Sequence, residues 1–265
     1  MLYKDEAVVL RTMRLGEADR IVTLIGRSNG KIRAVAKGVR RTKSRFGGRL
    51  EPFTHVSVVM WRGKSDLDTV TQVEVLEPFR PVREDLDRFA LGEVMLEACD
   101  RVVQEREPSS RGGPAGARAE LEGADILDLL VQSLRDLCSD DSPIVLASFL
   151  LRLSAIAGFA PSMDRCAECG APPSWFSPGQ GGAVCYACRS PDSEEVGSDI
   201  LHFMGDLAAR RFVQGPRGAI IGLRHWRSRL SDSEIRSASR LARFYTEYHL
   251  EKRLKSAAAV DAIRR

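Results

Sequence analysis

Four of the six cysteines in this 265-residue chain form two close pairs, Cys166-x-x-Cys169 and Cys185-x-x-Cys188. Fifteen residues separate the pairs, and this spacing is typical of a four-cysteine zinc site. Each pair can present two thiolates from one tight turn, and two such turns complete a tetrahedron around Zn²⁺. Two disulfides are the alternative, but we expect a cytosolic chain, in which thiols stay reduced. Four thiolates leave no open position for water or substrate, so we predict one structural Zn²⁺ per chain.

A second group of residues suited to chemistry is the basic stretch 27–49, which contains nine cations and no Asp or Glu. Cations this close repel one another unless an anion neutralises them, and counterion release favours a nucleic acid as that anion. Phosphate contacts read no sequence, so binding should be tolerant of sequence. A solvated basic loop is the simpler alternative. The predicted DNA contacts are Lys31, Arg33, Lys37, Arg40, Arg41, Lys43, Arg45, Arg49 and Arg62.

The same region suggests how strong and how salt-sensitive the binding would be. If about five of these cations engage single-stranded DNA, the slope of log K against log salt is near −3.5. That slope means a loss of roughly a hundredfold between about 50 and 200 mM salt. Phe46 and Trp61 could add base stacking of about 1–3 kcal/mol each, although a place in the core is the preferred interpretation of Trp61.

No catalytic motif accompanies these groups. The segment Gly63-Lys64-Ser65 resembles the end of a phosphate-binding loop, but position 58, where that loop needs glycine, is Val58. The four histidines are scattered, and Asp66 and Asp68 are interpreted as solvated residues of a polar turn. We therefore expect a binding protein and not an enzyme.

Residues 1–80 carry the signals of a small β-barrel. Five short runs rich in Val, Ile and Thr are separated by turn residues, at 6–13, 20–27, 31–37, 54–61 and 69–77. Five strands in this length fit an OB-fold, whose face and loops bind oligonucleotides, and fit an SH3-like barrel about as well. The basic stretch would cover the third strand and the long connection after it.

After two prolines the chain becomes helical. Helices are predicted at 85–104, 121–138, 144–157, 199–213 and 233–256. Ser231 and Glu234 have the spacing of a capping box at the start of the last one. The segment 107–119 is a flexible loop by composition, and 160–197, which holds the four cysteines, interrupts the helical pattern. We predict an α+β protein with a barrel domain at 1–80 and a helical domain at 81–265 that contains the insert.

Composition restricts the class further. The net charge is only +4, with 43% hydrophobic and 29% charged residues, as in ordinary globular proteins, so the positive charge matters only locally. No apolar run approaches the roughly 20 residues of a membrane span. Acidic residues stand where a signal peptide has its basic and apolar regions. We expect a cytoplasmic, nucleoid-associated protein.

Residues 7–53 resemble the RecO recombination mediator family of bacteria. The best-matching parts are Gly16-Glu17-x-Asp19, Lys37-Gly38-Val39-Arg40 and Lys43-Ser44. Gly158-Phe159-x-Pro161, followed by Cys166-x-x-Cys169-Gly170, is similar to the zinc-bearing members, and 248–256 resembles the closing helix of the family.

The resemblance implies an N-terminal OB-fold and a helical domain with an inserted zinc ribbon. It also implies binding of single- and double-stranded DNA and annealing of complementary strands. The implied partners are RecR, RecA and single-strand-binding protein (SSB): with RecR, family members help load RecA onto SSB-coated strands, and some recognise the acidic, hydrophobic SSB tail. Some relatives lack the cysteines, so zinc would not be required for the activity itself. The alternative is a zinc-ribbon RNA-binding or transcription adaptor without annealing activity.

Overall fold

The computed structural model describes residues 1–42, 44, 46–63, 67–103, 114–209, 213–214, 220–221, 226 and 228–263. These residues form two units, Met1–Cys138 and Ser139–Arg265, each with its own hydrophobic core. The predicted barrel, residues 1–80, lies in the first unit together with three helices. Among the described residues, no helix has both the length and the apolar character required to cross a membrane.

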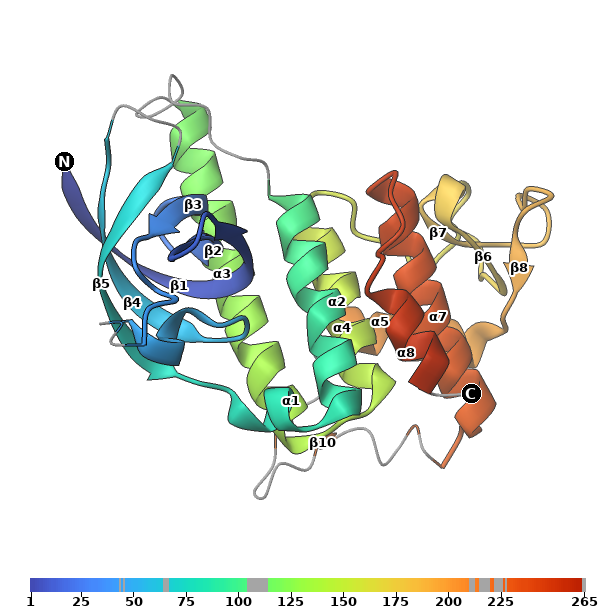
Figure 1. Ribbon diagram of the computed structural model, residues 1–265. Helices are drawn as coiled ribbons and strands as arrows, with labels where there is room; N and C mark the ends of the chain where they lie inside the picture. The colour runs from blue at the N-terminus through green and yellow to red at the C-terminus, as the bar shows by residue number, and fades with distance from the viewer. Residues whose placement is uncertain are drawn as a thin grey trace. The chain divides into compact units, whose positions relative to one another are not determined.

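Five strands close into a barrel in the order β1-β2-β3-β5-β4 (Figure 1). The strands are β1 (Leu2–Leu15), β2 (Asp19–Gly26), β3 (Gly30–Ala36), β4 (His55–Trp61) and β5 (Asp68–Glu77). The long strand β1 pairs antiparallel with both β2 and β4, and β3 lies parallel to β5. This closed five-stranded barrel is of the OB type, so the predicted fold class is confirmed and the SH3-like alternative is not.

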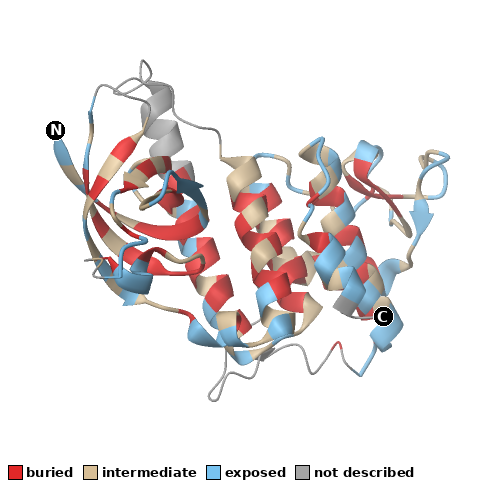
Figure 2. Ribbon diagram, in the orientation of Figure 1, coloured by how far each residue is buried: buried red, intermediate tan, exposed pale blue. Residues whose placement is uncertain are grey.

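Alternation along β3 explains why the basic stretch can form a strand. Ile32, Ala34 and Ala36 point into the barrel and are buried, whereas Lys31 and Arg33 take the outer positions. The barrel strands carry many buried residues (Figure 2), and those of the inner face form one apolar cluster. The connection after β3 contains the 3₁₀ turn η1 (Gly47–Leu50) and contributes buried side chains to the same core.

Helices α1 (Arg80–Glu84) and α2 (Leu86–Val102) follow the barrel. Helix α2 is buried over most of its surface, as its apolar residues on most faces predict. Gly92 allows its close approach to the barrel segment, because a Cβ there would lie 2.7 Å from the ring of Phe53. Cys99 on this helix is fully buried and is a core residue.

Helix α3 (Pro114–Ser139) runs along the barrel (Figure 1). A Cβ on Gly123 would lie 3.0 Å from the Cα of Gly30, so the helix and the β2–β3 turn touch backbone to backbone. The helix begins inside the stretch expected to be a loop at 107–119, because proline is tolerated in a first helical turn. Residues 107–113 of that stretch lie outside the described part of the chain.

The second unit is built on α4 (Pro143–Ile156), α5 (Ser198–Ala208) and α7 (Asp232–His249), which share one apolar core. The predicted capping box forms: Ser231 accepts from the backbone N–H of Glu234, whose carboxylate accepts from Ser231. Helix α7 ends earlier than predicted, at His249, and Glu251 then adopts a positive φ of 52°. The described part of this unit also contains α8 (Ala257–Ile263), β9 (Val213–Gln214) and β10 (Ile220–Ile221).

The insert forms a three-stranded sheet in the order β7-β6-β8. Its elements are β6 (Trp175–Ser177), η3 (Pro178–Gln180), β7 (Gly182–Val184) and β8 (Glu194–Glu195). One cysteine pair precedes β6 and the other directly follows β7, so this small sheet positions both pairs.

Candidate nucleic-acid interface and metal centre

The two cysteine pairs lie on two hydrogen-bonded turns. The backbone N–H of Gly170 donates to the carbonyl of Cys166 at 2.9 Å, and that of Arg189 donates to the carbonyl of Cys185 at 3.1 Å. Gly170 has a φ of 75°, a value that favours glycine. These turns orient all four sulfurs toward one point.

The four sulfurs of Cys166, Cys169, Cys185 and Cys188 lie within 4.8 Å of one another. The Sγ atoms of Cys169 and Cys185 are 3.7 Å apart. Two sulfurs bound tetrahedrally with bonds of about 2.3 Å would be about 3.8 Å apart, so the arrangement fits a single cation. Each of the six cysteines is free, and the disulfide alternative does not occur. The predicted four-cysteine cluster is confirmed.

Electrostatics also favours a cation in this cluster. Burial opposes ionisation of Cys166, but hydrogen bonds from surrounding backbone N–H groups and Cys169 lower the pKa of its thiol to about 6. Hydrogen bonding to the sulfurs of Cys169 and Cys185 raises the pKa of Cys188 to about 12, so without a metal ion this thiol keeps its proton at neutral pH. A divalent cation would offset the repulsion between four neighbouring thiolates and favour loss of that proton. Within the described residues, no other group of three or more His, Cys, Asp or Glu side chains gathers in this way.

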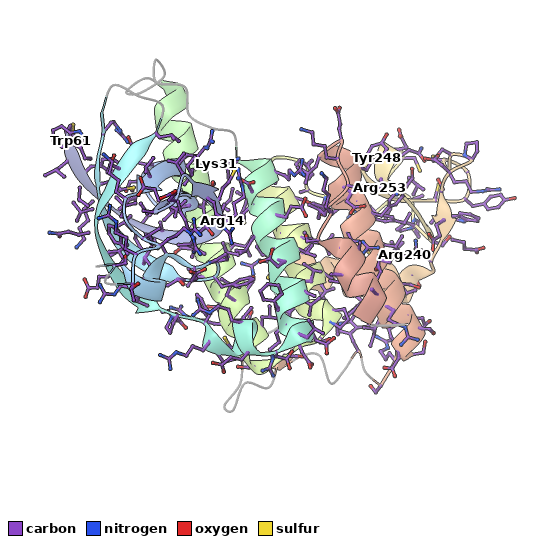
Figure 3. All side chains as sticks on the ribbon, viewed as in Figure 1. Arg14, Lys31, Trp61, Arg240, Tyr248 and Arg253 are labelled. Atoms are coloured by element: carbon purple, nitrogen blue, oxygen red, sulfur yellow. The ribbon has the colours of Figure 1, made fainter. Side chains whose placement is uncertain are left out.

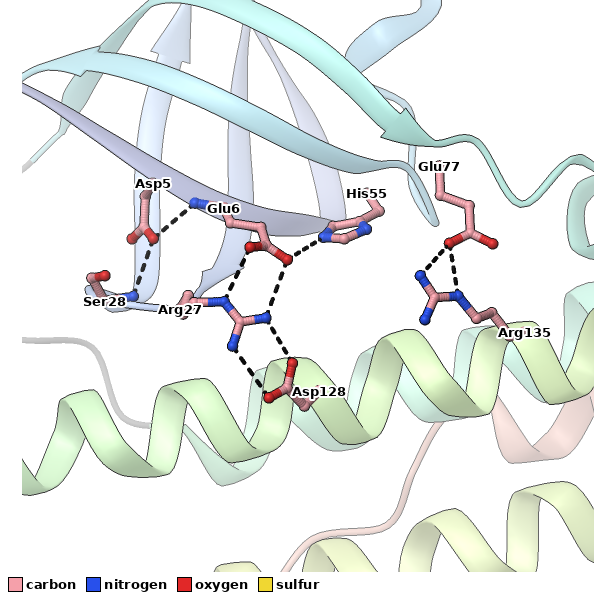
Figure 4. Close-up of polar contacts among 8 residues, drawn as sticks. All are labelled: Asp5, Glu6, Arg27, Ser28, His55, Glu77, Asp128 and Arg135. Atoms are coloured by element: carbon pink, nitrogen blue, oxygen red, sulfur yellow. Dashed lines mark hydrogen bonds and ion pairs between the residues drawn. The ribbon is translucent and has the colours of Figure 1, made fainter. Parts of the chain in front are cut away.

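Several cations of the basic stretch hold the first unit together. The guanidinium of Arg27 donates to both carboxylate oxygens of Glu6 at 3.1 Å and to Asp128 on α3 at 2.7 and 3.2 Å (Figure 4). The Nε2 of His55 lies 2.9 Å from Glu6. Arg27 lowers the pKa of both Glu6 and Asp128, and burial lowers the pKa of His55. This network fastens α3 to the barrel, as does the neighbouring ion pair of Glu77 and Arg135 at 2.8 Å.

Lys31 also has a partner inside the unit. Its ammonium is 2.8 Å from Asp100 on α2, and only 10% of its side chain is exposed. Arg11 approaches the same carboxylate at 2.9 Å. Burial opposes ionisation of Asp100, but the two cations hold its pKa below the ordinary value. Lys31 therefore presents little surface to a phosphate.

Arg62 is similarly engaged. It donates to the side-chain oxygen of Asn29 at 2.9 Å and stacks over the ring of Tyr3 at 4.3 Å. Its Nε is 3.8 Å from Asp68, which also accepts a hydrogen bond from the hydroxyl of Tyr3. Asp68 is buried, so its interpretation as a solvated turn residue is wrong. Asp66 lies outside the described residues.

Other cations of the stretch reach solvent at one end of the barrel. The backbone N–H of Gly38 donates to Asp19 at 2.7 Å, and that of Arg40 donates to the carbonyl of Ala18 at 3.0 Å. The guanidinium of Arg40 donates to the carbonyl of Glu17 at 2.9 Å. The connection after β3 is therefore held against the β1–β2 turn, and its cations collect there. We call the exposed residues Arg14, Lys37, Arg40 and Arg41 the cationic rim.

Arg14 was not predicted, because it lies outside the acid-free stretch. Strand register reveals it: Arg14 pairs with Arg20, which pairs with Ala36 at the end of β3. Arg49 is exposed on η1, whereas Arg33 is partly buried on the outer face of β3. The predicted contacts Lys43 and Arg45 lie outside the described residues.

The two aromatic predictions are reversed. Phe46 is 2% exposed in the barrel core, so the prediction that it stacks on bases is wrong. Trp61 is 49% exposed, so its assignment to the core is wrong. Phe46 directly precedes η1 and lies outside the strands, so no alternation indicates its side. Trp61 follows the buried Met60, and alternation along β4 places it on the outer face of the barrel.

The fold and the two sites define a class: an OB-type barrel protein with a second, helical unit that carries a four-cysteine ribbon. Family models described as "Recombination protein O N terminal" and "Recombination protein O C terminal" match residues 1–79 and 119–258. The chain is 44% identical to "DNA repair protein RecO" of a Nocardioides species, over 98% of this chain and 100% of the relative. It is 40% identical to the protein of that name from Thermobifida fusca, over 98% of both chains. The chain belongs to the RecO family, whose role is in recombinational DNA repair.

Proposed function

We propose that this chain is a DNA-binding recombination mediator. It binds single- and double-stranded DNA without sequence preference and anneals complementary strands. With RecR, it helps load RecA onto SSB-coated single strands, in the cytoplasm at the nucleoid, without catalysing a reaction. The observation that supports this best is the cationic rim on an OB-type barrel in a chain of the RecO family.

The rim would act by neutralising phosphates. Lys37, Arg40 and Arg41 belong to the connection after β3, which is fastened to the β1–β2 turn, and Arg49 lies further along the same connection. Arg14 lies on β1 itself, so little conformational freedom is lost when DNA binds. Contacts to the phosphate backbone read no base, which accounts for sequence tolerance. When two strands lie on the rim together, their mutual repulsion falls and base pairing completes the annealing. Lys31, Arg33 and Arg62 would add positive potential, and Lys43 and Arg45 further contacts.

The four cysteines would hold one structural Zn²⁺. Such an ion fixes two turns of a small sheet, and binding energies of about 10–16 kcal/mol are typical of structural zinc sites. Its four thiolate ligands leave no position for a substrate, so it would stabilise the ribbon and take no part in DNA binding.

The SSB tail requires a different surface, for which the second unit has a candidate. A groove of about 520 Å³ lies along α7 and α8, beside the partly exposed rings of Phe244 and Tyr248. Figure 3 labels Tyr248 on α7. The charged lining of the groove is mixed, so the exposed aromatic rings are the part that suits the hydrophobic residues of the tail; the charged residues are Arg243, Lys252, Arg253, Glu247, Glu251 and Asp261. Tyr248→Ser should weaken binding of a tail peptide without changing DNA binding.

The test of the mediator function is a fluorescence annealing assay with and without SSB. Arg40→Glu/Arg41→Glu should lose DNA binding and annealing together. The matched control is Arg236→Glu/Arg240→Glu on α7, which changes the net charge equally on exposed arginines of the other unit. Unchanged binding of the rim variant in a gel-shift titration would contradict the proposal. Equal or tighter binding to RNA without annealing would favour the adaptor function.

A further inference from the structure

One circuit of side chains around the outside of the barrel carries no charge. In register on neighbouring strands, Leu2 pairs with Trp61, Trp61 with Thr69, and Thr69 with Val35. Val35 pairs in turn with Ile21 of β2, and Ile21 pairs with Met13 of β1. Residues in register point to the same face, and their sequence neighbours here, such as Met60 and Ala34, are buried inside. The circuit consists of Leu2, Met13, Ile21, Val35, Thr69 and Trp61.

The circuit is most exposed where β1 and β4 meet. Trp61 is 49% and Leu2 58% exposed, although the two are adjacent and apolar. Figure 3 labels Trp61 at the outer edge of the barrel, beside the N-terminus. Among the residues that the structure describes, its indole makes no hydrogen bond and no ring contact. Two adjacent large apolar side chains in solvent indicate a binding surface more than single scattered ones do.

The charges near this surface suit an anionic partner. In the next outer row, the exposed Lys4 pairs with Val59, and Arg62 directly follows Trp61. Asp68 on β5 is buried, and the Nε of Arg62 lies 3.8 Å from it, so Lys4 is the exposed cation of this surface and Arg62 a partly balanced one. An apolar surface flanked by cations matches an unpaired nucleic-acid strand, which offers flat apolar base faces and anionic phosphates.

Trp61 lies close enough to the cationic rim for one nucleic-acid strand to contact both. Val35 lies two residues before Lys37 of the cationic rim, and β3 and β4 are separated by β5 alone. Two interstrand spacings amount to about 10 Å, which a short stretch of single strand can span. Bases in a duplex already stack on one another, so only an unpaired base can present its face to Trp61.

We infer that Trp61, with Leu2 beside it, is a stacking platform for unpaired bases and gives the barrel a preference for single strands over duplex. This rests on the proposed function, since the rim supplies the phosphate contacts that both forms of DNA share. The rim holds any DNA backbone, and Trp61 adds affinity only where bases are free.

The test compares Trp61→Ala with the conservative Trp61→Phe on three probes: an oligothymidylate, a duplex of equal length, and an abasic strand that keeps its phosphates. Trp61→Ala should bind the oligothymidylate about five- to a hundredfold more weakly than the wild type does. Its affinity for the duplex and the abasic strand should stay unchanged, and Trp61→Phe should retain most of the single-strand affinity. A thermal melt checks that both variants are folded.

Two outcomes would overturn the inference. One is an equal loss on all three probes, which would mean that Trp61 supports the barrel and does not stack on bases. The other is no loss on any probe while Arg40→Glu/Arg41→Glu loses binding, which would leave the proposed function intact. If the rim variant keeps its affinity for all probes, it is the proposed function that fails.

Discussion

Replacing Arg40 and Arg41 by glutamine should flatten the salt dependence of DNA binding by a predictable amount. Five cations are exposed in the rim and on η1, namely Arg14, Lys37, Arg40, Arg41 and Arg49. Five contacts to single-stranded DNA give a slope near −3.5, and three contacts give a slope near −2.1. Between about 50 and 200 mM salt, the wild type should lose about a hundredfold in affinity and the double variant about twentyfold.

The slope is a better measure than a single affinity. The guanidinium of Arg40 also donates to the carbonyls of Gly16 and Glu17, so its loss loosens the loop as well as removing a charge. A looser loop shifts affinity at every salt concentration, whereas the slope reports the number of neutralised phosphates. Fluorescence anisotropy of a labelled oligothymidylate across a salt series measures it.

Lys31→Gln is the control from the same basic stretch. Its ammonium is buried against Asp100, so the slope should stay that of the wild type. The unfolding free energy should fall by about 1–3 kcal/mol, because a hydrogen-bonded charge pair is lost while Arg11 still approaches the carboxylate. If Lys31→Gln flattens the slope as much as the double variant does, total charge and not its exposed placement controls binding, and the reasoning is refuted.

Three further outcomes are expected. Metal chelation should lower the melting temperature of the second unit and leave the affinity of the barrel for DNA unchanged; an unaltered melt would show that the ribbon folds without an ion. The pKa values of Glu6 and Asp128 are lowered by Arg27, so their contribution to stability is present above their ordinary values of 4.5 and 3.8 and is lost as pH falls. Urea unfolding below about pH 4.5 should therefore show falling stability, less steeply in Asp128→Asn. Gly123→Ala should cost about 1–3 kcal/mol, because its Cβ would press on barrel backbone, whereas Gly48→Ala, with nothing within 4 Å, should cost far less in the same denaturation assay.

The sequence alone determined the features whose causes are local. The spacing of Cys166, Cys169, Cys185 and Cys188 predicted their cluster, because two turns of fixed geometry bring four sulfurs together. Ser231 and Glu234 predicted a helix start, because a capping box involves only neighbouring backbone groups. The run 31–37, with turn residues on either side, likewise predicted a strand, because strand preference and turn formation depend on neighbouring residues.

Only the tertiary structure decided which cations are exposed and which are paired. Lys31 and Lys37 look alike in the sequence, both within a stretch without acids. Asp100, far along the chain, is packed against Lys31, while Lys37 stays exposed at the rim. Asp128 reaches Arg27 in the same way from α3. Electrostatic attraction depends on distance in space and not on distance along the sequence. The cations of an acid-free segment therefore stay unpaired only where folding places no carboxylate from elsewhere in the chain beside them.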